Sequence, residues 1–93
     1  MDIENFTEIH ELWKERVRLD GKDKALRKAK EELSELLVAI SHYEDGKENE
    51  YRILDEMVDV SLQCEKLIVM FDKNDFTAKQ RQKKYDYLES ITY

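Results

Sequence analysis

Residues 22–44 read KDKALRKAKEELSELLVAISHYE, and this stretch decides the fold class. Its large apolar residues recur at three- and four-residue spacings, which is the pattern of one face of an α-helix. Gly21 precedes the stretch and the turn-forming pair Asp45-Gly46 follows it, so a helix is predicted over 22–44. We expect its buried stripe to consist of Leu26, Leu33, Leu36, Leu37 and Ile40.

Three further helices are predicted before and after this one. Asn5, followed three residues later by Glu8, is a capping pair that opens a helix to about residue 18, and Leu19-Asp20-Gly21 ends it. Thr77 and Gln80 form a similar pair, which opens a last helix to about residue 89. The helix expected over 48–71 carries two apolar stripes and is therefore predicted to be buried nearly all round. The stripes are Ile53, Met57, Val60, Cys64, Leu67 and Phe71, then Leu54, Val58, Leu62 and Val69.

The whole chain of 93 residues is predicted to be one all-α domain, residues 1–93. It has no proline and two glycines, and no stretch shows the apolar alternation of a strand. Short connections between long helices favour a four-helix antiparallel bundle. The doubly apolar third helix needs more cover than three neighbours provide, which favours a homo-oligomer; a central helix buried within a monomer is the alternative.

Composition excludes several classes of function. A net charge of −6 argues against a protein that mainly binds nucleic acid through its phosphates. The single cysteine, Cys64, is expected to be a small core residue in a reducing compartment. The acidic first residues do not resemble a signal peptide, and no uncharged stretch reaches the roughly 20 residues of a membrane span, so no membrane contact and a cytoplasmic location are expected.

Five carboxylates occur where a helical bundle should be apolar. Glu31, Glu32 and Glu35 share about one side of the second helix, in the run EELSE. Glu56 and Asp59 lie among the apolar residues of the third helix. Because burying like charges together is costly, carboxylates paired across two helices usually need a cation or bound protons. Oxygen ligands without a nearby histidine suit Mg²⁺ or Mn²⁺ better than zinc, whereas EELSE alone could be a solvated helix face paired with Lys28 or Lys30.

The joint pattern resembles the MazG-like all-α nucleotide pyrophosphohydrolases, a family related to the dimeric dUTPases. Their signature is EExxE, a spacer, then ExxD. This chain has Glu31-Glu32-Leu33-Ser34-Glu35, a spacer of 20 residues, then Glu56-Met57-Val58-Asp59. The likeness covers about residues 13–85 and includes a tryptophan-bearing first helix and a basic segment in the last one.

The resemblance implies Mg²⁺-dependent hydrolysis of a nucleoside triphosphate between its α- and β-phosphates, giving a monophosphate and pyrophosphate. Matching positions imply that Glu32, Glu35, Glu56 and Asp59 are metal ligands, with Mn²⁺ as an alternative ion. Glu31 would hold a further metal ion or align the attacking water. Residues expected to meet the substrate are Trp13, by stacking on the base, and Lys28, Lys30, Lys83 and Lys84, at the phosphates. The expected partners are the nucleotide and further copies of the chain, as a homodimer or homotetramer.

A second class of function fits the same residues. A noncatalytic helical module could oligomerise through the third helix, bind a protein partner and retain a vestigial metal site. Other catalytic classes lack support in the sequence. Gly21 and Gly46 stand alone, so no phosphate-binding glycine loop exists. Neither His10 nor His42 follows a glutamate at the spacing of a di-iron helix, and no zinc or thiol motif occurs.

Overall fold

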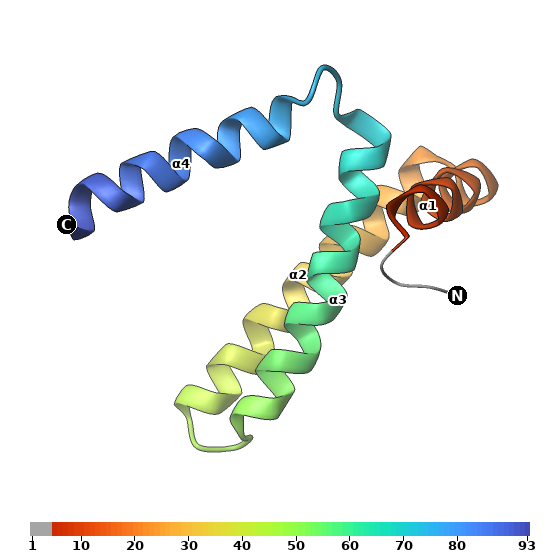
Figure 1. Cartoon of the computed structure of the whole chain (residues 1–93). Coiled ribbons are helices and arrows are strands. Elements are labelled where there is room, and N and C mark those ends of the chain that lie inside the picture. Colours follow the sequence, from red (N-terminus) through yellow and green to blue (C-terminus); the bar gives the residue numbers. More distant parts are fainter. Residues whose placement is uncertain (1–4) are drawn as a thin grey trace.

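The computed structural model describes residues 5–93, apart from the side chain of Phe6, so the acidic first four residues lie outside it. Four helices and no strand occur in this range, which confirms the all-α prediction (Figure 1). The helices are α1 (Phe6–Asp20), α2 (Lys22–Glu44), α3 (Glu50–Phe71) and α4 (Phe76–Thr92). Over the same range, none of them combines the length and apolar composition that crossing a bilayer would require.

Local hydrogen bonds explain where the first three helices begin and end. The Asn5 side chain accepts a hydrogen bond from the Glu8 amide at 3.1 Å, which confirms the predicted cap of α1. Gly21 is the single residue between α1 and α2. Its φ of 83° is a conformation that glycine adopts readily and other residues rarely adopt. The Asn49 side chain accepts from the Tyr51 amide at 3.0 Å, so α3 begins at Glu50 rather than at residue 48.

The predicted capping pair of α4 is wrong. Thr77 lies inside the helix, and Asp72, at the end of α3, accepts hydrogen bonds from both the amide and the hydroxyl of Thr77. Asn74 and Asp75 have φ of 57°, a left-handed conformation that these two residue types tolerate better than most. The side chain that fixes the start of α4 therefore comes from the first residue after α3.

Small residues form the contact between α2 and α3, the two antiparallel helices that pack most closely. Ala25, Ala29 and Ala39 are the buried apolar residues of α2, and Glu32 is buried on the same face. Since alanine lets two helix backbones approach, this face turns toward α3 in place of the leucines. The predicted leucine stripe is therefore wrong in part: Leu26 and Leu36 are half-buried, whereas Leu33, Leu37 and Ile40 are exposed.

A second apolar surface stays uncovered on the α2–α3 hairpin. On α3 the predicted burial all round does not occur in the single chain, because Met57, Cys64 and Ile68 are exposed at helical spacing. Helical geometry places them on the same side of the hairpin as the exposed α2 leucines, opposite Glu35 and Asp59. We call this surface the apolar face; its members are Leu33, Leu37, Ile40, Met57, Cys64 and Ile68.

The single chain does not close into a four-helix bundle. α1 packs against α2 and α3 near the start of α2, whereas α4 extends away from the other three helices (Figure 1). Helix α4 is weakly amphipathic and exposed at every residue from 81 to 93, and its large apolar residues stay uncovered in the single chain. The radius of gyration, 15.9 Å, exceeds the value of about 12 Å expected for a compact domain of this length.

Enlarging Ala39 should destabilise the hairpin. Ala39 is 0% exposed at the α2–α3 contact, so Ala39→Leu would force the two helices apart or distort side-chain rotamers. We expect the free energy of unfolding to fall by about 1–3 kcal/mol, measured by urea denaturation. The same substitution at the exposed Ala78 of α4 should leave stability unchanged; equal effects at both positions would contradict the packing described here.

Candidate metal centre

Two glutamates face each other across the α2–α3 contact. Glu32 and Glu56 are each only 7% exposed, although glutamate is rarely buried to this extent. Glu32 shares the face of α2 formed by the small residues, and Glu56 lies at the matching level of the antiparallel α3. The close approach of the two helices thus brings two carboxylates together in a partly dehydrated place.

Three more acids complete an acidic cluster. Glu32, Glu35 and Glu56 each place one carboxylate oxygen within 4.8 Å of the others. Asp55, Glu56 and Asp59 do the same, so Glu56 belongs to both groups. We call the five residues Glu32, Glu35, Asp55, Glu56 and Asp59 the acidic cluster. Within the described part of the chain both groups consist of carboxylates alone, which are hard oxygen donors.

Each buried glutamate has one oxygen paired and one oxygen without a partner. Lys28 Nζ lies 3.0 Å from Glu32 Oε1, and Arg52 Nε donates to Glu56 Oε1 at 3.2 Å. The second oxygens, Glu32 Oε2 and Glu56 Oε2, are buried and make no hydrogen bond among the described residues. An unpaired buried carboxylate oxygen is costly, and a divalent cation would compensate both. These two unpaired oxygens are the reason that the site fits Mg²⁺ or Mn²⁺.

The electrostatics of the cluster also favour a cation. The negative charge of Glu32 raises the pKa of Glu35 above its ordinary value, and partial burial and Glu56 act in the same direction. Partial burial raises the pKa of Asp59, with Glu32 and Asp55 adding to the effect. Lys28 and Arg52 therefore do not cancel the negative potential of five carboxylates. A bound cation would lower both pKa values again.

Of the five acids predicted for catalysis, the structure brings four together. Glu32, Glu35, Glu56 and Asp59 belong to the acidic cluster, whereas Glu31 is exposed outside both ligand groups, on the other side of Lys28. Asp55 and Arg52 were missed by the sequence analysis. The spacing of Asp55 and Asp59, four residues apart, was the available signal, since such residues share a helix face.

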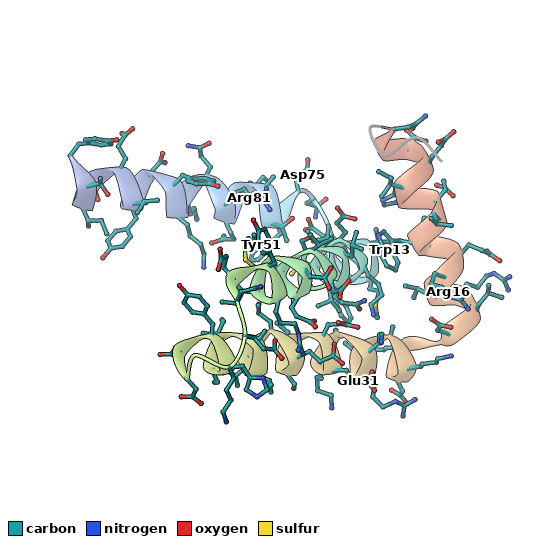
Figure 2. The ribbon with its side chains drawn as sticks, turned by 90° about the horizontal axis from the view of Figure 1, so that it is seen from below. Trp13, Arg16, Glu31, Tyr51, Asp75 and Arg81 are labelled. Carbon is teal, nitrogen blue, oxygen red and sulfur yellow. The ribbon has the colours of Figure 1, made fainter. Side chains whose placement is uncertain are left out.

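The predicted substrate-binding residues separate into two groups. Trp13 and Lys28 line one cavity of about 460 Å³ between α1, α2 and α3, together with Glu31. Trp13 lies on the side of α1 that faces α3, where its Nε1 donates to Glu65 at 3.3 Å (Figure 2). Lys30 is exposed on α2, and Lys83 and Lys84 lie on α4, which the single chain holds away from the acidic cluster (Figure 1).

Removing the charge of Glu35 should stabilise the metal-free protein at neutral pH. A raised pKa in the folded state contributes stability below the ordinary value of 4.5, and this contribution is lost as the pH rises through the folded value. Glu35→Gln removes the repulsion, so with chelator at pH 7 its melting temperature should exceed that of wild type. The difference should vanish below about pH 4.

The control for this prediction is Glu44→Gln, an exposed glutamate at the end of the same helix. Its melting temperature should follow that of wild type across the pH range. A Glu35→Gln variant that is less stable than wild type at pH 7 in chelator would show that Glu35 is held by favourable contacts and not by repulsion.

Comparison with known proteins adds no further constraint. No protein-family model, curated protein or solved structure matches the chain. The site is thus defined by its own geometry: an all-α hairpin with a carboxylate cluster suited to a divalent cation.

Proposed function

We propose that the chain is a Mg²⁺-dependent nucleoside triphosphate pyrophosphohydrolase, which cleaves ribo- or deoxyribonucleoside triphosphates between the α- and β-phosphates to a monophosphate and pyrophosphate. The acidic cluster carries this proposal, above all the two buried and unpartnered oxygens of Glu32 and Glu56. The resemblance of residues 31–35 and 56–59 to the MazG-like signature supports the choice of reaction. The structure places these two segments at the same level of one helical hairpin.

Glu32, Glu35, Glu56 and Asp59 would hold the metal ion, which would be Mg²⁺ or Mn²⁺. When bound, the ion would polarise the phosphoryl oxygens, offset charge on the leaving pyrophosphate and lower the pKa of a water molecule. The carboxylates form two overlapping groups of three, which is fewer ligands than octahedral Mg²⁺ needs, and Mg²⁺ commonly keeps water and substrate oxygens.

The neighbouring residues of the chain have distinct roles in this proposal. Arg52 bonds to both Glu48 and Glu56 and so fixes the carboxylate of Glu56. Lys28 lies between Glu31 and Glu32 and brings a positive charge to the edge of the cluster, where a phosphate would approach. Glu31, which is exposed beside Lys28, would hold a further metal ion or align the attacking water.

We further propose that the active form is a homo-oligomer. The chain exposes 7754 Å², about 2,000 Å² more than a compact monomer of its mass. A stable homodimer commonly buries on the order of 1,000–2,500 Å² per chain, so a second copy could cover the excess. The apolar face supplies the surface for this contact. Assembly would also offer α4, with Lys83 and Lys84, a neighbour to pack against.

The competing proposal is a noncatalytic helical module that oligomerises and binds a protein partner. One observation favours it: Lys28 and Arg52 already pair with the two buried glutamates, so a cation is not the only means of partial neutralisation. The two proposals differ in turnover. An enzyme should release pyrophosphate when the ion is present, whereas a module that retains only a vestigial metal site should bind the ion and release none.

The test is pyrophosphate release from a panel of canonical and modified nucleoside triphosphates, with Mg²⁺, with Mn²⁺ and with chelator. The proposal expects metal-dependent release of pyrophosphate and the matching monophosphate. Protein that is folded and binds either ion, but releases no pyrophosphate from any member of the panel, would favour the helical module.

A further inference from the structure

A basic cavity adjoins the acidic cluster and is left unexplained by the proposed metal site. It has a volume of about 460 Å³ and lies between α1, the first half of α2 and the second half of α3. Its walls include two acidic residues, Asp20 and Glu31. Five cationic residues also line it: Arg16, Lys24, Arg27, Lys28 and Lys66. The cavity thus has a formal charge of +3 in a chain whose net charge is −6.

The cations of this cavity are only partly neutralised. Asp20 is shared by Arg16, at 2.8 Å, and Lys24, at 3.5 Å. Lys28 is shared with Glu31 and Glu32, as described above. Asp20 alone neutralises both Arg16 and Lys24, and Arg27 makes no ion pair in the described range. The wall of the cavity therefore keeps several charged N–H groups that are free to donate to a bound anion.

One buried charged group lines the same cavity. Lys66 is only 3% exposed, and its Nζ donates one hydrogen bond to the Ala25 carbonyl at 2.7 Å, which leaves two N–H donors of the ammonium for other acceptors. A buried lysine that anchors no carboxylate is unusual, and an anion bound in the cavity would pair with it.

From these contacts we infer that the cavity binds an oligophosphate anion, with Arg27, Lys24 and Lys66 as its main ligands. Phosphate chains carry several charges in a small volume, pair with the fork of an arginine and reach several ammonium groups at once, whereas a single carboxylate brings one negative charge to a wall that carries three net positive charges. Lys28 links the cavity to the acidic cluster, because it lines the one and lies 3.0 Å from Glu32 of the other. The inference that the cavity holds the phosphate chain of a substrate rests on the proposed function. The inference that the cavity binds an oligophosphate anion is independent of it.

Trp13 lies at the cavity and can report directly on anion binding there. Trp13 lines the cavity and is the only tryptophan of the chain, so its indole N–H gives a single, assigned NMR signal. We would titrate the full-length protein, kept metal-free with chelator, with inorganic pyrophosphate and follow this signal. Wild type should show a saturable shift. Orthophosphate should bind at least about 10-fold more weakly, because it makes fewer charged hydrogen bonds.

The variants test which residues are used. Arg27→Gln and Lys24→Gln, both at exposed positions, should each raise the dissociation constant for pyrophosphate by roughly 10-fold or more. The matched control is Lys47→Gln, an exposed lysine in the turn after α2, which removes the same charge far from the cavity. Its dissociation constant should stay within about twofold of wild type. Lys66→Met should also weaken binding if it folds, but the test does not depend on it.

Three results would overturn the inference: no saturable shift with pyrophosphate, equal affinity for orthophosphate, or equal weakening by Arg27→Gln and Lys47→Gln. Failure of the proposed function is distinguishable from these. Pyrophosphate binding that depends on Arg27, in a protein that hydrolyses no nucleotide, supports the cavity and removes the enzyme. Turnover that is unchanged in Arg27→Gln, without pyrophosphate binding, keeps the enzyme and removes the cavity as an oligophosphate site.

Discussion

Glu56→Gln is expected to lower kcat/KM for nucleotide hydrolysis by about 100-fold or more, while the protein stays folded. Glu56 is the only carboxylate shared by both groups of potential ligands, and its Oε2 is buried without a partner. Glutamine keeps the shape of the side chain and offers one oxygen, but it removes the negative charge that would hold a divalent ion. Hydrolysis should be followed as pyrophosphate release with the best substrate of the panel.

The matched control for this variant is Glu50→Gln, in the exposed first turn of the same helix. It should retain wild-type activity. Circular dichroism and a melting curve in chelator would establish that Glu56→Gln is folded. Activity within a few-fold of wild type in folded Glu56→Gln would contradict the assignment of the acidic cluster as the catalytic metal centre.

Leu37→Glu is expected to convert the proposed oligomer into monomers. Leu37 is 67% exposed in the single chain and belongs to the apolar face. In a twofold-symmetric contact each substitution occurs twice, and burying one leucine stabilises by about 1.5–3 kcal/mol. The dissociation constant of the oligomer should therefore rise by about 100-fold or more. Light scattering coupled to size-exclusion chromatography, at micromolar protein concentration, measures the change.

The neighbouring Val38 provides the control. It is also an exposed apolar residue of α2, but it points about 100° further round the helix and away from the apolar face. Val38→Glu should leave the oligomer intact. Wild type that is monomeric at high concentration, or oligomers equally sensitive to both substitutions, would contradict the proposal that the apolar face joins two copies of the chain.

Much of the fold was predictable from local sequence signals. The break at Gly21, the turn at Asp45-Gly46 and the cap at Asn5 are short-range features, and the structure confirms each of them. The capping pair at Thr77 failed because the acceptor is Asp72, the residue that follows α3. The Thr77 amide and hydroxyl donate to the Asp72 carboxylate, five residues earlier in the chain. Residue spacing alone does not show which side chain accepts the hydrogen bonds at the start of a helix.

The face that α2 turns toward α3 was not predictable from hydrophobicity. The leucines of α2 predicted the wrong contact because close packing of two helices favours alanine, which carries little hydrophobic signal. Their exposure is understandable if they cover another copy of the chain. The clustering of Glu32 and Glu35 with Glu56 followed from helical spacing and one return of the chain, so this part of the site could be anticipated.

The basic cavity as a whole could not be predicted from the sequence. Its cations come from three helices, and Arg16, Lys24 and Lys66 carry no common motif. Trp13 and Lys28 were predicted from the sequence as substrate-binding residues and do line the cavity, whereas Lys83 and Lys84, predicted with them, belong to the projecting helix α4. Only the crossing of α1 over the α2–α3 hairpin brings the cavity residues together, and side-chain patterns along one helix do not encode that crossing.

Binding of Mn²⁺ to the metal-free protein tests the central claim most directly, because it does not depend on the choice of nucleotide. Free Mn²⁺ can be quantified by electron paramagnetic resonance as it is titrated into wild type, Glu56→Gln and Glu50→Gln. We predict saturable binding to wild type and Glu50→Gln, displacement by Mg²⁺, and binding at least about 10-fold weaker in Glu56→Gln. No saturable binding to folded wild type, or equal binding by all three proteins, would contradict a divalent-cation site in the acidic cluster.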